Sequence, residues 1–305
     1  MGLACGNTQS DRAANNNRTA NTNRTNGAGS GTCNLVTKRS DTDYETEEGR
    51  GIFIETYDVN GNLVAWESDY GADGTVDASG TVINTYDANG RLLTKERVSD
   101  PSTSRTTYTY DADGNLLLEV IVTVASYGPV TGRNSYTYDA NGNRLTCVQD
   151  YGDDGYIEHS NTYTYDANGN MLTDEYSNKP DGTATRRTTY TYDADGNLLI
   201  EGQDGDADGT VDGRTTFTYD ADGNLLTKEY QGVGFPVSRR TTYTYDADGN
   251  LLIEEEDGSG GAPLDGIVDR RVSYTYDADG NLLTEEHDDR AKGTVNLRIT
   301  YTYDC

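Results

Sequence analysis

The sequence predicts an all-β protein, an elongated array of about nine and a half antiparallel β-hairpin repeats in an extended, twisted or spiralling sheet. A Tyr-Asp pair occurs ten times, at spacings of 24–31 residues. Such a period is typical of a repeat array, in which each unit buries its apolar face against its neighbours. In most repeats the residues before the pair alternate Thr with Tyr, which favours strands. No window has a helical hydrophobic period.

The repeat at residues 214–229 illustrates the predicted hairpin. Residues 215–219 are all β-branched or aromatic, so they form a strand with Phe217 and Tyr219 on one face. The Asp-Ala-Asp-Gly-Asn segment that follows is a turn, and Gly223 supplies the positive φ that closes it. The return strand begins at Leu225; whether Leu225 or Leu226 faces the Tyr side stays open.

Two domains are predicted. Residues 1–40 form an arm of low complexity, rich in Asn, Thr, Arg and Gly, which carries too little apolar surface to order itself. Residues 41–305 form the array, with about 19 strands, and it ends in half a repeat at residues 298–304. A half repeat leaves an unpaired strand edge, which another copy could extend head to tail. The residues predicted to take part in this assembly are Cys5, Cys33, Tyr301, Tyr303 and Cys305.

The charge is strongly acidic and unevenly distributed. The net charge is −28, and because residues 1–40 carry +4, the array carries −32. Such a surface repels nucleic acid and anionic membranes and attracts cations. The alternative interpretation is that the charge serves only to keep the protein soluble. The sequence contains no transmembrane run. Met1 to Gly6 resembles the end of a bacterial lipoprotein signal, so a lipid anchor at Cys5 and a chance likeness both stay open.

The repeated pattern Tyr-x-Tyr-Asp-x-x-Gly-x-Leu resembles the YD repeats of Rhs proteins, teneurins and the shell components of insecticidal toxin complexes. In this chain it is seen at Tyr110, Asp111, Gly114 and Leu116, and again around Asp193. The resemblance implies a long antiparallel sheet that forms either a shell around a toxin or a cell-surface adhesion body. The family often has Arg after the Gly, as Arg91 here, although Asn is commoner in this chain.

A calcium site is predicted in the loop that reads Asp-x-Asp-x-Asp-Gly-x-x-Asp. Alternate carboxylates on a tight loop that contains Gly can converge on Ca²⁺, which takes six to eight oxygens. A merely acidic turn is the alternative. The predicted ligands here and in three weaker loops are Asp204, Asp206, Asp208 and Asp212; Asp69, Asp73 and Asp77; Asp150, Asp154 and Glu158; and Asp265 and Asp269.

Catalytic signals are poor, so the chain is predicted not to be an enzyme. The two histidines, His159 and His287, do not stand at a metal-binding spacing, and no nucleophile or phosphate-binding motif occurs. Paired arginines such as Arg186 and Arg187 open three strands and are expected to pair with acidic residues across the sheet.

Three functions follow from these features. The first is an extracellular structural protein that assembles with itself, head to tail, into a calcium-stabilised fibre or surface layer. The second is a monomeric adhesin on a bacterial surface, which binds glycans or proteins. The third is a fragment of an Rhs-like shell that encloses a toxin.

Overall fold

The computed structural model describes residues 34–43, 50–58, 61–70, 72–99, 102–126, 128–232, 234, 237–258, 264–289 and 293–304. These residues form twenty β-strands and no helix. The prediction of an all-β protein is therefore confirmed, with one strand more than the sequence indicated. No helix in this part of the chain is long and apolar enough to cross a bilayer.

The chain divides into two compact units. The first unit contains Val82–Thr216. Its strands are β5 (Leu92–Ser99), β6 (Ser102–Tyr110), β7 (Leu116–Ala125), β8 (Gly128–Tyr138), β9 (Arg144–Tyr151), β10 (His159–Tyr165), β11 (Met171–Ser177), β12 (Arg186–Tyr192) and β13 (Leu198–Asp204). Each pairs antiparallel with the next.

The second unit contains most of the remaining described residues, from both ends of the chain. Its strands are β1 (Asn34–Asp43), β2 (Arg50–Tyr57), β3 (Leu63–Tyr70), β15 (Leu225–Gly232), β16 (Val237–Tyr245), β17 (Leu251–Asp257), β18 (Arg270–Tyr276), β19 (Leu282–Asp288) and β20 (Leu297–Asp304). Two further strands, β4 (Ala78–Tyr86) and β14 (Gly213–Tyr219), begin in one unit and end in the other.

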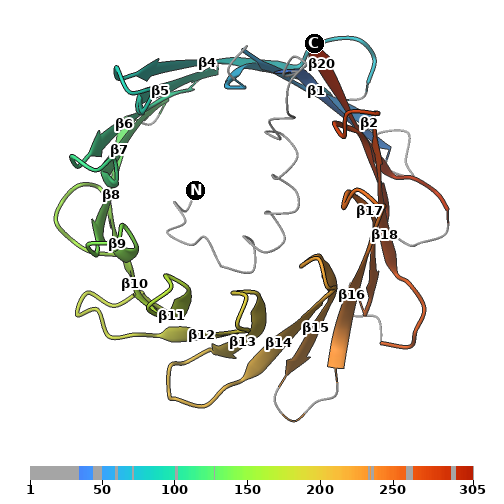
Figure 1. Cartoon of the computed structure of the whole chain (residues 1–305). Coiled ribbons are helices and arrows are strands. Elements are labelled where there is room, and N and C mark those ends of the chain that lie inside the picture. The colour runs from blue at the N-terminus through green and yellow to red at the C-terminus, as the bar shows by residue number, and fades with distance from the viewer. Residues whose placement is uncertain are drawn as a thin grey trace. The chain divides into compact units, whose positions relative to one another are not determined.

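The last strand of the chain pairs with the first strand that the structure describes. β20 lies antiparallel beside β1 along its length, from the pair Asn34–Asp304 to the pair Thr42–Leu297 (Figure 1). β1 also pairs with β2, and β20 with β19. The expectation of an extended sheet with an unpaired final strand is therefore wrong, because β1 completes the half repeat. β1 lies largely within the segment assigned to the arm.

Each repeat folds as a hairpin whose two faces differ. On one face, here called the Tyr face, lie the Tyr of each Tyr-Asp pair, the residue two positions before it (Tyr in most repeats) and the first residue of the return strand (Leu in most repeats). Leu225 is 3% exposed and Leu226 is 38% exposed, so the first leucine of the pair faces the Tyr side. On the other face, threonines form hydrogen bonds across the hairpin, as between Thr218 Oγ1 and Thr227 Oγ1 (2.7 Å). This alternation follows from the period of two in a strand.

The opposite face also carries ion pairs. Arg187 Nη2 lies 2.5 Å from Glu175 Oε1, and Arg240 Nε lies 2.6 Å from Glu229 Oε1. The prediction that the paired arginines meet acidic neighbours across the sheet is thus confirmed. These side chains are partly exposed to solvent, so each pair contributes about 0–1 kcal/mol to stability.

Candidate functional site

The turn of each repeat is built around the Asp of its Tyr-Asp pair. In the hairpin that ends at Tyr110, Asp111 Oδ1 accepts the backbone N–H of Asn115 (2.8 Å), and Asp111 Oδ2 accepts the Asn115 side-chain amide (2.9 Å). Gly114 has a φ of +95°, which a residue with a side chain rarely adopts. The pattern Asp-x-x-Gly-Asn is therefore explained by turn geometry.

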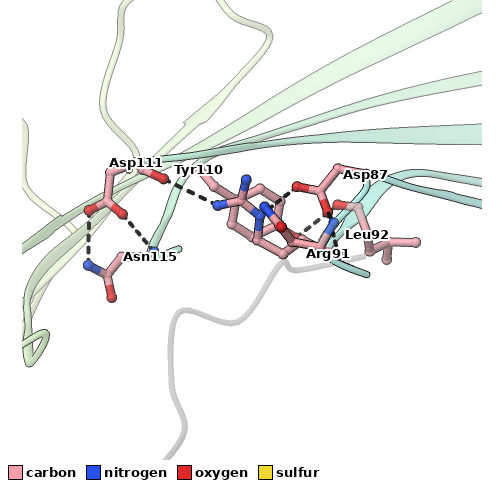
Figure 2. Close-up of polar contacts among 7 residues, drawn as sticks. Asp87, Arg91, Leu92, Tyr110, Asp111 and Asn115 are labelled. Atoms are coloured by element: carbon pink, nitrogen blue, oxygen red, sulfur yellow. Dashed lines mark hydrogen bonds and ion pairs between the residues drawn. The ribbon is translucent and has the colours of Figure 1, made fainter. Parts of the chain in front are cut away.

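Arg91 stands where most repeats have Asn, and it joins two successive turns (Figure 2). Its Nε donates to Asp87 Oδ2 (2.6 Å), and its Nη1 donates to the carbonyl of Asp111 (3.3 Å). The guanidinium also lies 5.2 Å from the centre of the Tyr110 ring. A planar cation can make all of these contacts at once, which the shorter Asn cannot.

Tyrosine hydroxyls link most repeats to the one before. The Tyr110 hydroxyl donates to the carbonyl of Leu92 (2.8 Å), as Figure 2 shows. Equivalent bonds of 2.8–2.9 Å are formed by Tyr138, Tyr165, Tyr192, Tyr245, Tyr276 and Tyr303. The Tyr of the repeat thus has a specific role, because phenylalanine would leave the carbonyl without this donor.

These turns favour the ionised form of their aspartates. The pKa of these aspartates is lowered most by the hydrogen bond from the side-chain amide of the Asn four residues later. This holds for Asp111, Asp139, Asp166, Asp193, Asp220 and Asp246. Hydrogen bonds to a carboxylate stabilise its charged form. The acidic composition of the turns is therefore compatible with their structure in the absence of any ligand.

Two aspartates in one turn give a direct test of this account. Asp220 accepts from the backbone N–H groups of Asp222 and Asn224 and from the Asn224 amide, whereas Asp222 is exposed. Asp220→Ala is expected to lower the free energy of unfolding, because it removes the acceptor of these three hydrogen bonds, as when a helix cap is lost. Asp222→Ala, the matched control, should change it by less than about 0.5 kcal/mol. Equal effects in urea denaturation would contradict the assignment.

The predicted calcium ligands lie in the variable loops, where they accept backbone hydrogen bonds. Asp204, at the end of β13, is 5% exposed. Its Oδ1 accepts from the N–H of Asp208 (3.2 Å), and its Oδ2 accepts from the N–H of Gly209 (2.8 Å). Burial raises the pKa of Asp204, but these N–H groups outweigh it, so the pKa lies below its usual value.

The same arrangement recurs in the three weaker loops. Asp69 and Asp150 bind the N–H groups of their loops as Asp204 does. In the fourth loop this role belongs to Asp257, which sequence reasoning missed although it ends a strand just before a glycine. The residues that close the loops each accept one backbone N–H at 2.5–2.7 Å; they are Asp77, Glu158, Asp212 and Asp269.

Three predicted ligands come close to one another. One carboxylate oxygen each from Asp204, Asp206 and Asp208 lies within 4.8 Å of the others, the one such acidic group among the described residues. Asp212, predicted as the fourth ligand, is not in that group. Asp73, Asp154 and Asp265 accept the N–H of the residue two positions later.

The Tyr face carries a row of carboxylates that the sequence analysis did not identify. In register opposite the first Tyr of a hairpin stand Glu119, Asp174, Glu201, Glu254 and Glu285. Asn134 Nδ2 donates to Glu119 Oε2 (2.9 Å), and Asn161 Nδ2 donates to Asp174 Oδ1 (2.8 Å). The signal that could have located the row is an acid in the fourth position of the return strand.

Several atoms of the Tyr face have no hydrogen-bond partner. Tyr190 is 4% exposed and Glu201 is 6% exposed, and the two residues are opposite each other in the register. Tyr190 Oη and Glu201 Oε2 are buried without a partner, as is Oδ1 of Asn134. Burying such atoms without a partner costs roughly 1–3 kcal/mol each, and more for a charged group.

The residues predicted to take part in assembly separate into two groups. Tyr301 and Tyr303 lie in β20, where Tyr303 donates to the carbonyl of Leu282 (2.9 Å) and Tyr301 to Glu285 Oε2 (3.2 Å). They are opposite Lys38 and Leu35 of β1. The other three predicted residues, Cys5, Cys33 and Cys305, lie outside the described residues.

Comparison with known proteins identifies the repeat. The family model described as RHS Repeat matches residues 86–126. This segment contains Arg91 and the turns at Asp87 and Asp111. No curated protein matches the sequence.

Among solved structures, the chain is similar to TcdB2-TccC3 without its hypervariable C-terminal region, at 16% identity over 82% of this chain and a TM-score of 0.42. It is also similar to the Tc holotoxin pore of Photorhabdus luminescens, at 17% identity, 81% coverage and a TM-score of 0.40. It spans 14% of the length of each of these chains. A porin-like protein from Bacteroides uniformis gives 12% identity over 88% of this chain and 98% of that chain, with a TM-score of 0.37.

Proposed function

Because this chain is built from YD repeats of the RHS type, we propose that it is an extracellular structural protein of the Rhs-like shell kind. In this proposal its Tyr face holds an extended polypeptide, and the chain performs no reaction of its own. The hydrogen bonds from tyrosine hydroxyls to backbone carbonyls support a structural role in a shell, since they join successive repeats. Cys147 is disulfide-bonded, which supports an oxidising compartment outside the cytoplasm.

The polar chemistry of the Tyr face carries the proposal. Tyr190 Oη and Glu201 Oε2 are buried without a hydrogen-bond partner, and a polypeptide rich in Arg and Asn would supply donors. Assembly of copies through a free β20 edge, by contrast, loses its basis, because β1 of the same chain occupies that edge. A sheet that binds a polypeptide on its Tyr face needs no free strand edge.

Peptide binding tests this function. The full-length protein would be titrated with fluorescent twenty-residue peptides of two kinds, one rich in Arg and Asn and one rich in Glu and Asn. We expect the basic peptide to bind at least tenfold more tightly and to be released by salt. Glu201→Gln should weaken binding several-fold, whereas Glu175→Gln, on the opposite face, should not. Equal binding of both peptides would contradict the proposal.

We also propose a structural Ca²⁺ ion in the Asp204–Asp212 loop. Its support is the approach of Asp204, Asp206 and Asp208 to within 4.8 Å, together with the preference of Ca²⁺ for carboxylate oxygens. Asp206 and Asp208 are exposed, so each could turn toward an ion without breaking a buried contact. The ion would offset the mutual repulsion of the three charges.

The test compares stability with and without the metal. Asp206→Asn combined with Asp208→Asn is expected to lower the melting temperature in millimolar Ca²⁺ and to change it little in EDTA, because bound ligand stabilises only the folded state. The pair Asp73→Asn and Asp154→Asn, in two weaker loops, is the control. An equal loss of stability in both solutions would identify an ordinary acidic turn.

A further inference from the structure

A cavity of about 750 Å³ lies within the second unit, between the turns of two successive repeats. One turn begins at Asp220, after β14, and the other begins at Asp246, after β16. In the antiparallel pair of β15 and β16, the residue pair nearest to the turns is Thr227–Thr242. The strand ladder therefore stops short of both turns, which leaves space between them.

The lining of this cavity carries negative charge and aromatic rings. It includes three tyrosines of the Tyr face and no basic residue. Two aspartates from each turn also line it, namely Asp220, Asp222, Asp246 and Asp248. These carboxylates are not grouped around one metal ion, because among the described residues only the loop at Asp204–Asp208 brings three acidic ligand atoms within 4.8 Å of one another. The cavity is therefore better suited to an organic cation whose charge is spread over several donors.

An arginine of the chain itself occupies the equivalent space between two other turns (Figure 2). Arg91 and Asn224 both stand four residues after the Asp of their turn, to which each donates its backbone N–H at 2.8 Å. The Arg91 guanidinium reaches the carbonyl of Asp111 in the next turn (3.3 Å) and lies 5.2 Å from the centre of the Tyr110 ring. In this type of repeat, the space between two successive turns thus accommodates a guanidinium.

The turns at Asp220 and Asp246 present the same acceptors but have a shorter side chain between them. The side-chain amide of Asn224 donates to Asp220 Oδ2 (2.9 Å), so it is bound within its own turn. The carbonyls of Asp246 and Asp111 each accept the N–H of the Gly three residues later, at 3.2 and 3.3 Å. The group that Arg91 contacts in its next turn is therefore present here too, without an arginine to reach it.

We propose that this cavity binds the guanidinium group of an arginine in the polypeptide that the Tyr face holds. The guanidinium donates to the Asp246 carbonyl and lies over the Tyr245 ring, as that of Arg91 does in its own pair of turns. The exposed carboxylates of Asp222 and Asp248 strengthen the binding, because hydrogen bonds between charged groups are the stronger ones. This inference rests on the proposed function, since tyrosines of the Tyr face line the cavity.

Two basic peptides of equal charge test the inference. The full-length protein would be titrated with the fluorescent peptide rich in Arg and Asn and with the same peptide carrying Lys in place of every Arg. We expect the Arg peptide to bind roughly fivefold more tightly, because a planar guanidinium stacks on an aromatic ring and donates to two acceptors at once. Equal binding of the two would overturn the inference and leave the proposed function standing. If neither peptide binds, both fail.

A variant that supplies the guanidinium from the chain tests the position of the site. Asn224→Arg should fill the cavity and abolish the preference for the Arg peptide over the Lys peptide. Asn143→Arg is the control, because it adds the same charge at the same place in a repeat whose two turns carry Asn141 and Asn168 instead of aspartates. It should leave the preference unchanged. A preference that persists in Asn224→Arg would overturn the assignment, and the comparison of peptides on the unaltered protein decides the matter even if a variant folds poorly.

Discussion

Replacing Gly258 with alanine is expected to lower the free energy of unfolding by roughly 3–5 kcal/mol. Gly258 follows β17 with a φ of +88°, a conformation that costs alanine about 1–2 kcal/mol. A Cβ at this position would lie 2.2 Å from the carbonyl oxygen of Ser238 and 3.1 Å from Arg239 Cα. Because both obstacles are backbone, the start of β16 would have to move.

Gly266 provides the control for this prediction. Its φ is +84°, close to that of Gly258, but nothing lies within 4 Å of the position that its Cβ would take. Gly266→Ala should therefore cost only the conformational term of about 1–2 kcal/mol. Urea denaturation of both variants measures the difference. If the two variants lose the same free energy of unfolding, Gly258 does not lie as close to β16 as the structure shows.

Raising the pH from 10 to 12 is expected to unfold the protein more readily than it would a protein with exposed tyrosines. Burial raises the pKa of Tyr57 and Tyr276 to about 12. It also raises the pKa of Tyr163 and Tyr190, which are each about one-twentieth exposed. The hydroxyl of Tyr276 must keep its proton to donate to the carbonyl of Leu251 (2.9 Å).

The sign follows from the direction of these shifts. A tyrosine whose folded pKa exceeds the unfolded value of about 10 contributes stability that is complete below pH 10 and is lost as the pH rises through the folded pKa. Each tyrosine that ionises only in the unfolded state costs about 1.4 kcal/mol per pH unit in that window. Urea midpoints at pH 8, 10 and 11, with tyrosinate absorbance at 295 nm, measure the effect. A midpoint that stays constant to pH 11 would contradict the buried tyrosines.

The hairpins could be predicted because their signals are local. Thr and Tyr alternation specifies a strand, and the Asp-x-x-Gly turn requires a positive φ, which Gly223 has at +84°. The choice between Leu225 and Leu226 could not be made, because a one-residue bulge after the turn sets which leucine faces the tyrosines. Equivalent bulges occur in the return strands β13 and β17, at Leu199 and Leu252. Such a shift inverts every later side chain.

The pairing of β1 with β20 could not be predicted for a different reason. Residues 37–43, Thr-Lys-Arg-Ser-Asp-Thr-Asp, have no apolar alternation and are distant in sequence from their partner. Their pairing depends on backbone hydrogen bonds and on the edge that β20 provides. In the acidic loops the residue pattern was found, but Asp and Gly serve turns and metal ions equally well. Only the backbone N–H groups that donate to Asp204 and Asp212 show that these two carboxylates stabilise the loop itself.

Residue-resolved hydrogen exchange in β20 of the dilute protein tests the central claim, that the chain completes its own last repeat. The amides of β20 that alternate away from β19 would bond to β1 in this structure. We expect them to be protected as strongly as amides in β18, at every protein concentration. Fast exchange at those alternate positions, or protection that appears only as concentration rises, would contradict the account and restore an open edge that pairs with another copy.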